Sequence, residues 1–250
     1  MKIGVQLEPQ HTTIADLRRA WREADATGFD SIWTWDHFFP LHGDPNGPHF
    51  EAYSLLAAMA VETSRAIFGA MVTSVSYRNP DLLADMARTI DQLSGGRFVL
   101  GLGAGWFERD YREYGYPFGS KADRVRAFGE AVPRIKARLQ KLNPPPAGRM
   151  PILVGAGGER VMLRHVAEHA DIWNGFGTSA SWGAKNQVLN QWCEKVGRDP
   201  TAIERSVLVD ASGLDAVDDY AAAGVEHLVV ELPHPFELGP AAAVLQAARA

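Results

Sequence analysis

Cysteine is almost absent from this sequence, which contains one, Cys193, among 250 residues. A disulfide within the chain needs two cysteines, and a zinc site built from clustered cysteines needs several, so the sequence excludes both. Cys193 follows Trp192 in a pattern of apolar residues at helical spacing. We therefore expect it to pack in the core and not to act as a nucleophile.

Long apolar runs and basic runs are missing as well. No stretch approaches the roughly 18 uncharged apolar residues that predict a membrane-spanning helix, and residues 1–4 begin a strand instead of a signal peptide. The net charge is -5 and no run of five basic residues occurs, so nucleic acid and anionic membrane surfaces are not expected partners. We expect a cytoplasmic protein that acts on small molecules.

Apolar residues are plentiful: 46% of the chain is hydrophobic, enough for a sizeable core. Their spacing predicts eight strands that alternate with eight helices. Thr13 and Ser120 each stand three residues before an aspartate, a capping pattern that marks a helix start, and Pro133 should kink or split its helix. The expected strands are 2–7, 30–35, 67–73, one within 97–106, 151–154, 171–174, 204–209 and 227–232; the expected helices are 14–28, 51–63, 83–95, 120–139, 159–169, 181–196, 216–223 and 240–249.

This regular alternation predicts a single α/β domain over residues 1–250, a (β/α)8 or TIM barrel with both termini at the end where the strands start. An open, doubly wound sheet is the alternative. The stretch 101–106 argues against it, since Trp106 stands where the third glycine or alanine of a dinucleotide-binding G-x-G-x-x-G motif belongs. Residues 143–146, Asn-Pro-Pro-Pro, form a stiff connector and the strongest linker pattern in the chain.

Two glycine clusters follow expected strands. Gly101, Gly103 and Gly105 end the first of these strands, and glycine lets the backbone adopt positive φ and approach a ligand closely. Gly155–Gly158 stand before an expected helix start, where backbone N–H groups and the helix dipole favour an anion such as phosphate. A tight turn that binds nothing is the alternative for the first loop. Two such loops in one chain favour a cofactor site.

His37 is the predicted acid or base. In a (β/α)8 barrel the active face lies at the carboxyl ends of the strands, and His37 follows the second strand there. Imidazole titrates near neutral pH; a histidine that only bonds at a loop start is the alternative. Asp36 and His37 could ligate a metal, but no HxH or HExxH spacing accompanies them, so no metal is predicted. Trp106 is free to line a flat ligand, whereas Trp33 and Trp35 are expected to pack in the barrel wall.

Seven stretches in order carry a family resemblance: Asp36-His37-Phe38, Tyr77-Arg78-Asn79-Pro80, Leu93-Ser94-Gly95-Gly96-Arg97, Gly101 to Trp106, Pro151 to Gly155 with Gly157-Gly158, Ala170 to Asn174, and Ala223 to His227. Together they resemble the luciferase-like monooxygenase superfamily, and especially its oxidoreductases that use the deazaflavin coenzyme F420. The resemblance covers nearly the whole chain. It is specific for the superfamily and not for a substrate.

The resemblance implies roles for individual residues. His37 would face the reacting carbon, and Asp36 and Ser74 would contact the deazaflavin head. A non-proline cis peptide bond is implied at Met71-Val72, and the molecule would be a homodimer. The residues that would bind the cofactor are Asp36, Met71, Val72, Ser74, Gly103, Ala104, Gly105, Trp106, Gly155, Ala156, Gly157 and Gly158, of which Gly105 and Trp106 would meet the ring or linker and the last four the phosphate.

The implied activity is hydride transfer between F420 and a small organic substrate, because carbon 5 of a deazaflavin carries two electrons as hydride. An FMN-dependent monooxygenase and a cofactor-binding protein without turnover are the alternatives, since F420 and FMN share a ribityl phosphate. Arg109, Arg112, Lys121 and Arg160 favour F420, whose glutamate tail is acidic; solvated surface charges are the alternative for these four residues.

Two features depart from the family pattern. Longer members carry an insertion where this chain has only residues 143–148, which implies a more open site. Members that oxidise glucose 6-phosphate place a glutamate acid after the fourth-strand glycines, where this chain has Trp106. Oxidation of a sugar phosphate is therefore not predicted.

Overall fold

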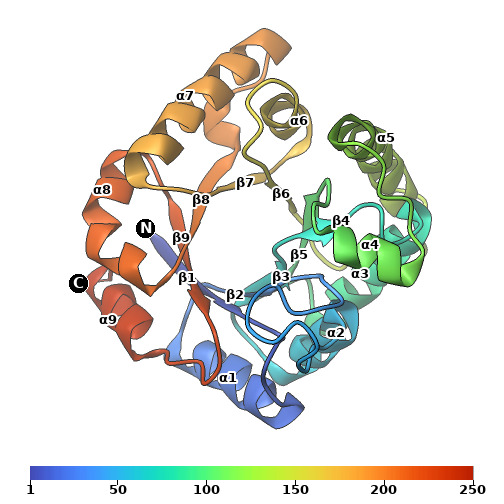
Figure 1. The fold of residues 1–250 in the computed structure, drawn as a ribbon. Coiled ribbons are helices and arrows are strands. Elements are labelled where there is room, and N and C mark those ends of the chain that lie inside the picture. Colours follow the sequence, from blue (N-terminus) through green and yellow to red (C-terminus); the bar gives the residue numbers. More distant parts are fainter. Residues whose placement is uncertain (250) are drawn as a thin grey trace.

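Parallel strands close into a barrel at the centre of the protein (Figure 1). The computed structural model describes residues 1–249. The strand order is β3-β2-β1-β9-β8-β7-β6-β5-β4, a β3–β5 pairing closes the ring, and β4 continues the β3 position alongside β5. The predicted (β/α)8 barrel is confirmed and the open sheet is wrong. The strands are β1 Lys2–Leu7, β2 Ser31–Thr34, β3 Ile67–Ala70, β4 Thr73–Ser74, β5 Phe98–Gly103, β6 Ile152–Gly155, β7 Ile172–Gly175, β8 Glu204–Val209 and β9 His227–Leu232.

Helices form the outer ring of the barrel (Figure 1). Local sequence sets several of their ends. The side chain of Thr13 accepts a hydrogen bond from the backbone N–H of Asp16, and Ser120 with Asp123 forms a reciprocal capping box. Gly28 ends the first helix in the left-handed conformation. The helices are α1 Ile14–Thr27, α2 Ala52–Glu62, α3 Pro80–Ser94, α4 Glu108–Tyr114, α5 Lys121–Leu139, α6 Met162–His169, α7 Ser179–Val196, α8 Val217–Ala222 and α9 Gly239–Ala247, with 3-10 turns at Pro200–Ala202 and Ala211–Ala216.

Three local features differ from the pattern read from sequence. Residues 108–114 form α4, which their largely charged sequence does not predict, because the buried side chains of Asp110 and Tyr111 hold it to the barrel. α5 is not split at Pro133; Val132 and Ile135 are buried on either side of the proline and anchor the helix. α6 begins at Met162 and not at residue 159, so an extended turn separates it from the second glycine cluster.

Apolar side chains form two layers, one inside the barrel and one between strands and helices. Cys193 is fully buried in the outer layer, as predicted. Inside the barrel, Trp33 is also fully buried, and a Cβ on Gly69 would come within 3.2 Å of its ring. Side chains thus fill the middle of the barrel. The space for a ligand lies above them, at the carboxyl ends of the strands. The inner layer consists of Trp33, Met71, Val99, Leu153, Ile172 and Val229.

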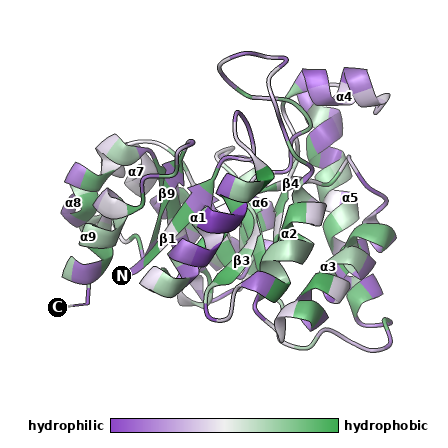
Figure 2. Cartoon of the chain, turned by 90° about the horizontal axis from the view of Figure 1, so that it is seen from below, coloured by the Kyte–Doolittle hydropathy of each residue, from purple (hydrophilic) through white to green (hydrophobic). Residues whose placement is uncertain are grey.

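The two ends of the chain lie close together on the side of the barrel where the strands start, as predicted (Figure 2). β1 and β9 pair from Lys2↔His227 to Leu7↔Leu232, which joins the first and last strands. Met1 and Arg249 border the same shallow depression. Within the described part of the chain, no helix is long and apolar enough to cross a bilayer.

Candidate active site

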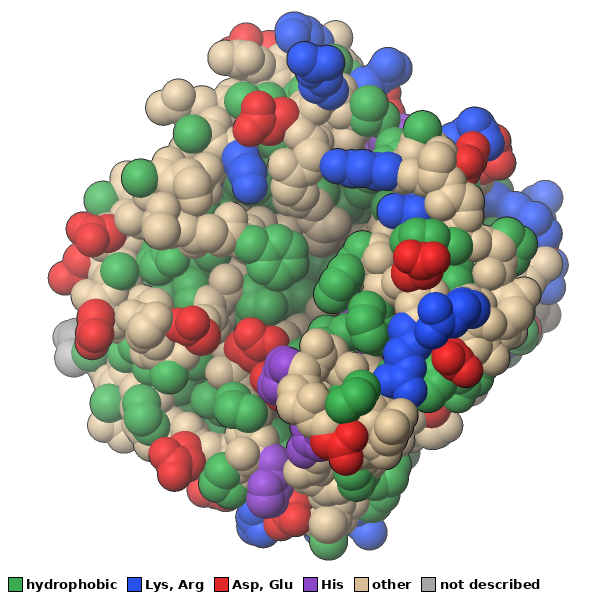
Figure 3. Space-filling model, viewed as in Figure 1, with side chains coloured by type: hydrophobic (Ala, Val, Ile, Leu, Met, Phe, Trp, Pro, Cys, Tyr) green, Lys and Arg blue, Asp and Glu red, His purple; other side chains and the backbone are tan. Residues whose placement is uncertain are grey.

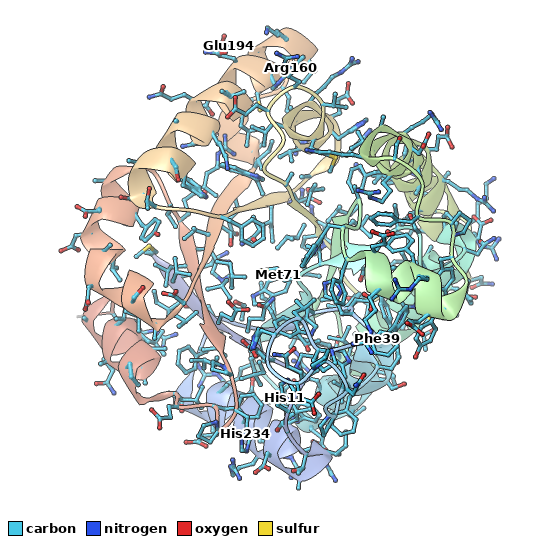
Figure 4. All side chains as sticks on the ribbon, viewed as in Figure 1. His11, Phe39, Met71, Arg160, Glu194 and His234 are labelled. Carbon is cyan, nitrogen blue, oxygen red and sulfur yellow. The ribbon has the colours of Figure 1, made fainter. Side chains whose placement is uncertain are left out.

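A cavity of about 720 Å³ opens at the carboxyl ends of the strands. Figure 3 shows it as a hollow near the middle of the face, and Met71 lies at the centre of the barrel below it in Figure 4. The structure brings every residue predicted for the site to this one cavity. Those residues are Asp36, His37, Met71, Val72, Ser74, Gly103, Ala104, Gly105, Trp106, Gly155, Ala156, Gly157 and Gly158.

His37 is held by a buried carboxylate that comes from α4. Its Nδ1 lies 2.6 Å from Oδ2 of Asp110, whose side chain is completely buried. Tyr77 donates its hydroxyl to the same oxygen at 2.7 Å, and the backbone N–H of Phe38 donates to Oδ1 at 3.0 Å. A carboxylate only accepts, so the proton of neutral His37 is on Nδ1 and its Nε2 is free for a ligand.

Tyr77 is fixed as the donor in this group. Burial raises the pKa of its hydroxyl, and the hydrogen bond to Asp110 raises it further. Tyr77 therefore stays protonated near neutral pH and donates to Asp110, which orients the imidazole. The sequence does not assign Asp110 a role, because nothing in the charged run 108–110 distinguishes the one residue that becomes buried. No sequence pattern marks the chain reversal that buries it.

Asp36 and His37 are adjacent in the chain but have different partners. Asp36 is fully buried as a side chain and accepts two hydrogen bonds from Arg78, at 2.6 and 3.0 Å. Arg78 also donates to Glu51 at 2.7 Å and stacks over the ring of Tyr53. Burial lowers the pKa of Arg78, but Asp36, Tyr53 and Glu51 together raise it more, so the guanidinium stays charged. Asp36 thus lines the cavity as one half of an ion pair.

The first glycine cluster makes room for protein atoms more than for a ligand. A Cβ on Gly101 would lie 1.9 Å from the carbonyl oxygen of Ala70. Gly105 has φ +79, and a Cβ there would lie 1.8 Å from the hydroxyl of Tyr111. Gly101 does not border the cavity and is required by close packing, whereas Gly105 borders the cavity and also leaves space for Tyr111.

Val72 forms part of the cavity wall between two strands. A Cβ on Gly103 would lie 2.6 Å from its side chain, and a Cβ on Gly155 would lie 2.9 Å from it, so both glycines give it space. The Met71–Val72 peptide bond is cis, as the family resemblance implied. Gln6 donates its side-chain amide to the carbonyl of Met71 at 2.9 Å.

The second glycine cluster leaves open space beside the backbone. A Cβ on Gly157 would meet only the ammonium of Lys185, at 3.5 Å, and one on Gly158 would meet only the side chain of Met162, at 3.6 Å. Gly157 does not have positive φ. The helix that follows begins four residues beyond Gly158, so no helix start at residue 159 is available to an anion. The features that favour an anion here are the open backbone and the nearby lysine.

Charges of opposite sign lie on opposite sides of the cavity (Figure 3). Lys121 and Arg124 line it from α5, whereas Asp210 and Glu231 line it beyond β8 and on β9. The strand order puts β9 four positions from β5, directly across the barrel. Burial raises the pKa of Glu231, and the neighbouring Glu8 raises it further.

The basic residues singled out from sequence divide into two groups. Lys121 lines the cavity. Arg109 instead bonds the side chain of Asn46 at 2.9 Å and stacks over Phe39, and Arg112 pairs with its neighbour Glu113. Figure 4 shows Arg160 at the outer edge near α6. Of the four, Lys121 is therefore positioned to meet a ligand in this cavity.

Aromatic side chains surround His37 at the mouth of the cavity. The Trp106 ring is 61% exposed, and its centroid lies 5.7 Å from that of His37 in an edge-on arrangement. Phe107 lies beside Trp106, with 5.4 Å between their ring centroids, and its ring is also edge-on to His37, at 5.6 Å. Trp35, which was expected only to pack, also lines the cavity and donates its indole N–H to His49 at 3.0 Å. Trp106 is thus available to a flat ligand, as predicted.

His49 should make the stability of the protein depend on pH. Burial lowers its pKa from 6.5 to about 4, with a further contribution from the charge of His37. Below pH 6.5 the unfolded chain binds a proton at this residue that the folded protein does not, so stability is complete above pH 6.5 and falls between pH 6.5 and 4. The shift corresponds to about 3 kcal/mol.

Urea unfolding at pH 7, 5.5 and 4.5 measures this effect. His49→Gln keeps an acceptor for the Trp35 indole but does not titrate, so we expect it to lose less stability over this range than the wild type. Equal losses in the two proteins would show that His49 does not contribute.

Comparisons with known proteins agree with this geometry. The sequence profile of the family "Luciferase-like monooxygenase" matches residues 1–238. An uncharacterized protein of Mycobacterium bovis is 26% identical over 254 residues, which cover 90% of this chain and 88% of that protein.

Two solved structures share the barrel fold. An F420-dependent secondary alcohol dehydrogenase, in complex with an F420-acetone adduct, has a TM-score of 0.88 at 16% identity and covers 100% of this chain and 99% of its own. The oxygenating constituent of 3,6-diketocamphane monooxygenase from Pseudomonas putida, in complex with FMN, has a TM-score of 0.68 at 16% identity and covers 83% and 66%. At such identities the likeness concerns the fold.

Proposed function

The chain belongs to the luciferase-like monooxygenase family, and from that premise we propose that it binds coenzyme F420 and transfers a hydride between it and a small organic substrate. One observation carries the proposal. His37, oriented by Asp110, borders the same cavity as the open backbone at Gly157 and the wall made by Val72. An acid, a flat apolar wall and an anion cradle are the three parts that such a reaction needs.

The residues present fit the proposed cofactor. A flat ring would lie against Val72, which two glycines seat in the wall, and its phosphate would meet the open backbone at Gly157 and Gly158 with Lys185 nearby. A bound deazaflavin supplies carbon 5 as the site that gives or takes the hydride. Asp36, paired with Arg78, would offer its buried carboxylate to the polar edge of the deazaflavin ring.

His37 moves the proton that accompanies the hydride. When a carbonyl substrate is reduced, the hydride goes to carbon and the imidazolium form of His37 gives its Nε2 proton to oxygen, which leaves neutral His37 with its proton on Nδ1; in the reverse direction neutral His37 accepts the proton at Nε2. Asp110 holds the ring with Nε2 toward the cavity and stabilises the charged imidazolium. Trp106 and Phe107 restrict water around the imidazole.

The substrate would occupy the side of the cavity near β8 and β9. A second cavity of about 560 Å³ shares Asp210 and Glu231 with the first. Leu232, Pro233 and Pro235 give it an apolar wall. This wall supports a hydrophobic or aromatic substrate.

The charges favour F420 over FMN. Lys121 and Arg124 stand at the cavity, where the acidic tail of F420 would extend, and FMN has no such tail. The FMN-dependent monooxygenase is the second candidate, supported by the FMN complex among the structures of the same fold. A binding protein without turnover is the third, and it would require His37 to serve only structure.

Titration of the purified protein with F420 and with FMN tests the proposal. Cofactor fluorescence should report tighter binding of F420, and reduced F420 should be oxidised in the presence of at least one member of a panel of ketones and enones without oxygen consumption. Tighter binding of FMN with oxygen consumption would favour the monooxygenase. Tight F420 binding with no turnover on the panel would favour the binding protein.

Gly157→Val should weaken binding of both F420 and FMN. The new side chain meets only Lys185 in the protein, so we expect the fold to be unchanged while the valine occupies the space proposed for the phosphate. Gly239→Val is the matched control, since Gly239 also has open space around it and lies on α9. Unchanged affinity in Gly157→Val, measured by the same fluorescence titration, would place the phosphate elsewhere.

We further propose that the protein is a cytoplasmic homodimer, as the family resemblance implies. Val61 on α2 is exposed, and so are Leu82 and Leu93 on α3, which border one groove between α2 and α3 and offer apolar surface to a second copy. Light scattering that reports a monomer at micromolar concentration would contradict this.

A further inference from the structure

One turn of α6 carries three side chains with the chemistry of metal ligands. His165, Glu168 and His169 are spaced i, i+3 and i+4, which puts them on one face of the helix. One ligand atom from each lies within 4.8 Å of the other two. Nδ1 of His165 is 3.4 Å from Oε2 of Glu168, and Nε2 of His169 is 3.8 Å from the same oxygen.

These distances suit a tetrahedral ion. Bonds of about 2.1 Å to nitrogen and oxygen place neighbouring ligands of a tetrahedral zinc ion about 3.4 Å apart. The first pair already has that separation, and the second needs a shift of a few tenths of an ångström. All three side chains are partly buried, so small rotations are available to them.

The protein around His165 holds its ring in place. The ring packs against Phe128 of α5, with 5.7 Å between centroids. A Cβ on Gly129 would lie 2.9 Å from the same ring, so α5 has a glycine where the imidazole needs space. Glycine inside a helix costs roughly 0.5–1 kcal/mol relative to alanine. The space for the imidazole thus lowers the stability of α5.

His165 also has an unsatisfied polar atom. Its Nδ1 is buried and has no hydrogen-bond partner, although it faces Glu168. A buried nitrogen without a partner is unfavourable, and a bound ion would satisfy it. The His169 ring stacks parallel to the His165 ring, at 6.0 Å and 14°, so both imidazoles border the same space.

We propose that His165, Glu168 and His169 bind a zinc ion on α6, outside the catalytic cavity. Two imidazoles and one carboxylate are an established zinc ligand set, and a water molecule would complete the tetrahedron. None of the three residues lines the cavity described above. The ion would join successive turns of an eight-residue helix that has no side-chain N-cap and that follows the Gly155–Gly158 loop.

Zinc should therefore stabilise the folded protein. An eight-residue helix is marginal on its own, and a ligand that binds the folded state alone raises stability with its concentration. The proposal is independent of the proposed function, since it concerns residues that neither substrate nor cofactor would touch.

Calorimetric titration of tag-free, chelator-treated protein with zinc chloride tests the site. We expect one equivalent to bind, and His165→Asn and His169→Asn each to weaken binding by at least about 100-fold, because even the loss of an outer partner of a metal ligand costs about 10–100-fold. Cobalt in place of zinc should give visible absorption bands in the wild type and not in the variants. His234→Asn is the control: it changes a half-exposed histidine far from α6 (Figure 4) and should leave binding unchanged.

Gly129→Ala gives a second test that keeps all three ligands. The new methyl group would press on the His165 ring, so zinc affinity should fall, whereas Gly183→Ala, with only ordinary contacts on α7, should have no effect. Absence of stoichiometric zinc binding by the wild type, or equal binding by wild type and both histidine variants, would overturn the proposal.

Discussion

His37→Ala is expected to bind F420 nearly as well as the wild type and to transfer hydride about 10²–10⁴-fold more slowly, the usual contribution of a positioned general acid or base. The imidazole borders the cavity, and Asp110 fixes its proton on Nδ1 through a 2.6 Å contact. Removing the ring takes away the proton donor while the proposed cofactor contacts at Val72 and Gly157 remain. Stopped-flow oxidation of reduced F420 by a substrate found in the panel measures the rate.

His37→Asn is the companion variant, because its amide can still donate to Asp110 and keep that carboxylate satisfied. We expect a similar loss of rate with little loss of stability. Asp110→Asn should act through His37: the amide no longer fixes the imidazole tautomer, so the pH profile of the rate should shift while the substrate's KM changes less than kcat.

If His37→Ala turned over as fast as the wild type, another residue would have to be the acid. Glu231 lines the cavity, and burial raises its pKa, so it is the next candidate. Glu8 is bonded to Gln10 at 3.1 Å and borders only the adjoining cavity, and Glu108 does not line the cavity at all. Glu231 is therefore a better placed alternative than Glu8 or Glu108.

Asp36→Ala should lower the free energy of unfolding by about 3–5 kcal/mol, the typical cost of removing one partner of a buried ion pair. Arg78 donates two hydrogen bonds to Asp36, and its side chain is only 11% exposed. Without Asp36, the guanidinium retains Glu51 but loses its buried carboxylate. Cofactor binding should weaken too, since Asp36 lines the cavity. Urea unfolding measures the stability effect.

A double variant distinguishes the contribution of the ion pair to stability from the role of Asp36 in the cavity. Asp36→Leu with Arg78→Met removes both charges and fills their space, so it should recover much of the stability that either single change loses. Glu113→Ala, which breaks the exposed pair with Arg112, is the control and should cost about 0–1 kcal/mol. A similarly small loss in Asp36→Ala would show that the buried pair contributes little.

Several features of the site could be predicted because they are written in local sequence. The repeated change from apolar runs to helical spacing predicts the barrel, and a barrel puts the ends of its strands on one face. Glycines and aromatic residues directly after those ends, such as Gly157 and Trp106, therefore meet at one cavity. His37 could be singled out for the same reason, from its position after a strand and its titration range.

The glycines of the fourth-strand stretch show where this reasoning fails. Gly101 looks like a ligand-contacting residue in sequence, yet the carbonyl of Ala70 occupies the space beside it, and Gly105, which does border the cavity, also gives space to Tyr111. Sequence indicates that a side chain must be absent at such a position. It does not indicate which atoms need the space, because those atoms come from another part of the chain.

Sequence by itself thus determined the barrel, its open end and the residues that surround the cavity, since each depends on local periodicity and on the order of elements. Tertiary structure alone decided the partners. Asp110 reaches His37 from 73 positions away and Arg78 reaches Asp36 from 42. These pairs depend on how α4 and the loop after β4 fold over the barrel. Both aspartates are buried, and a buried carboxylate needs hydrogen-bond donors. Asp110 therefore bonds and orients the imidazole of His37, and Asp36 bonds Arg78 at the cavity wall.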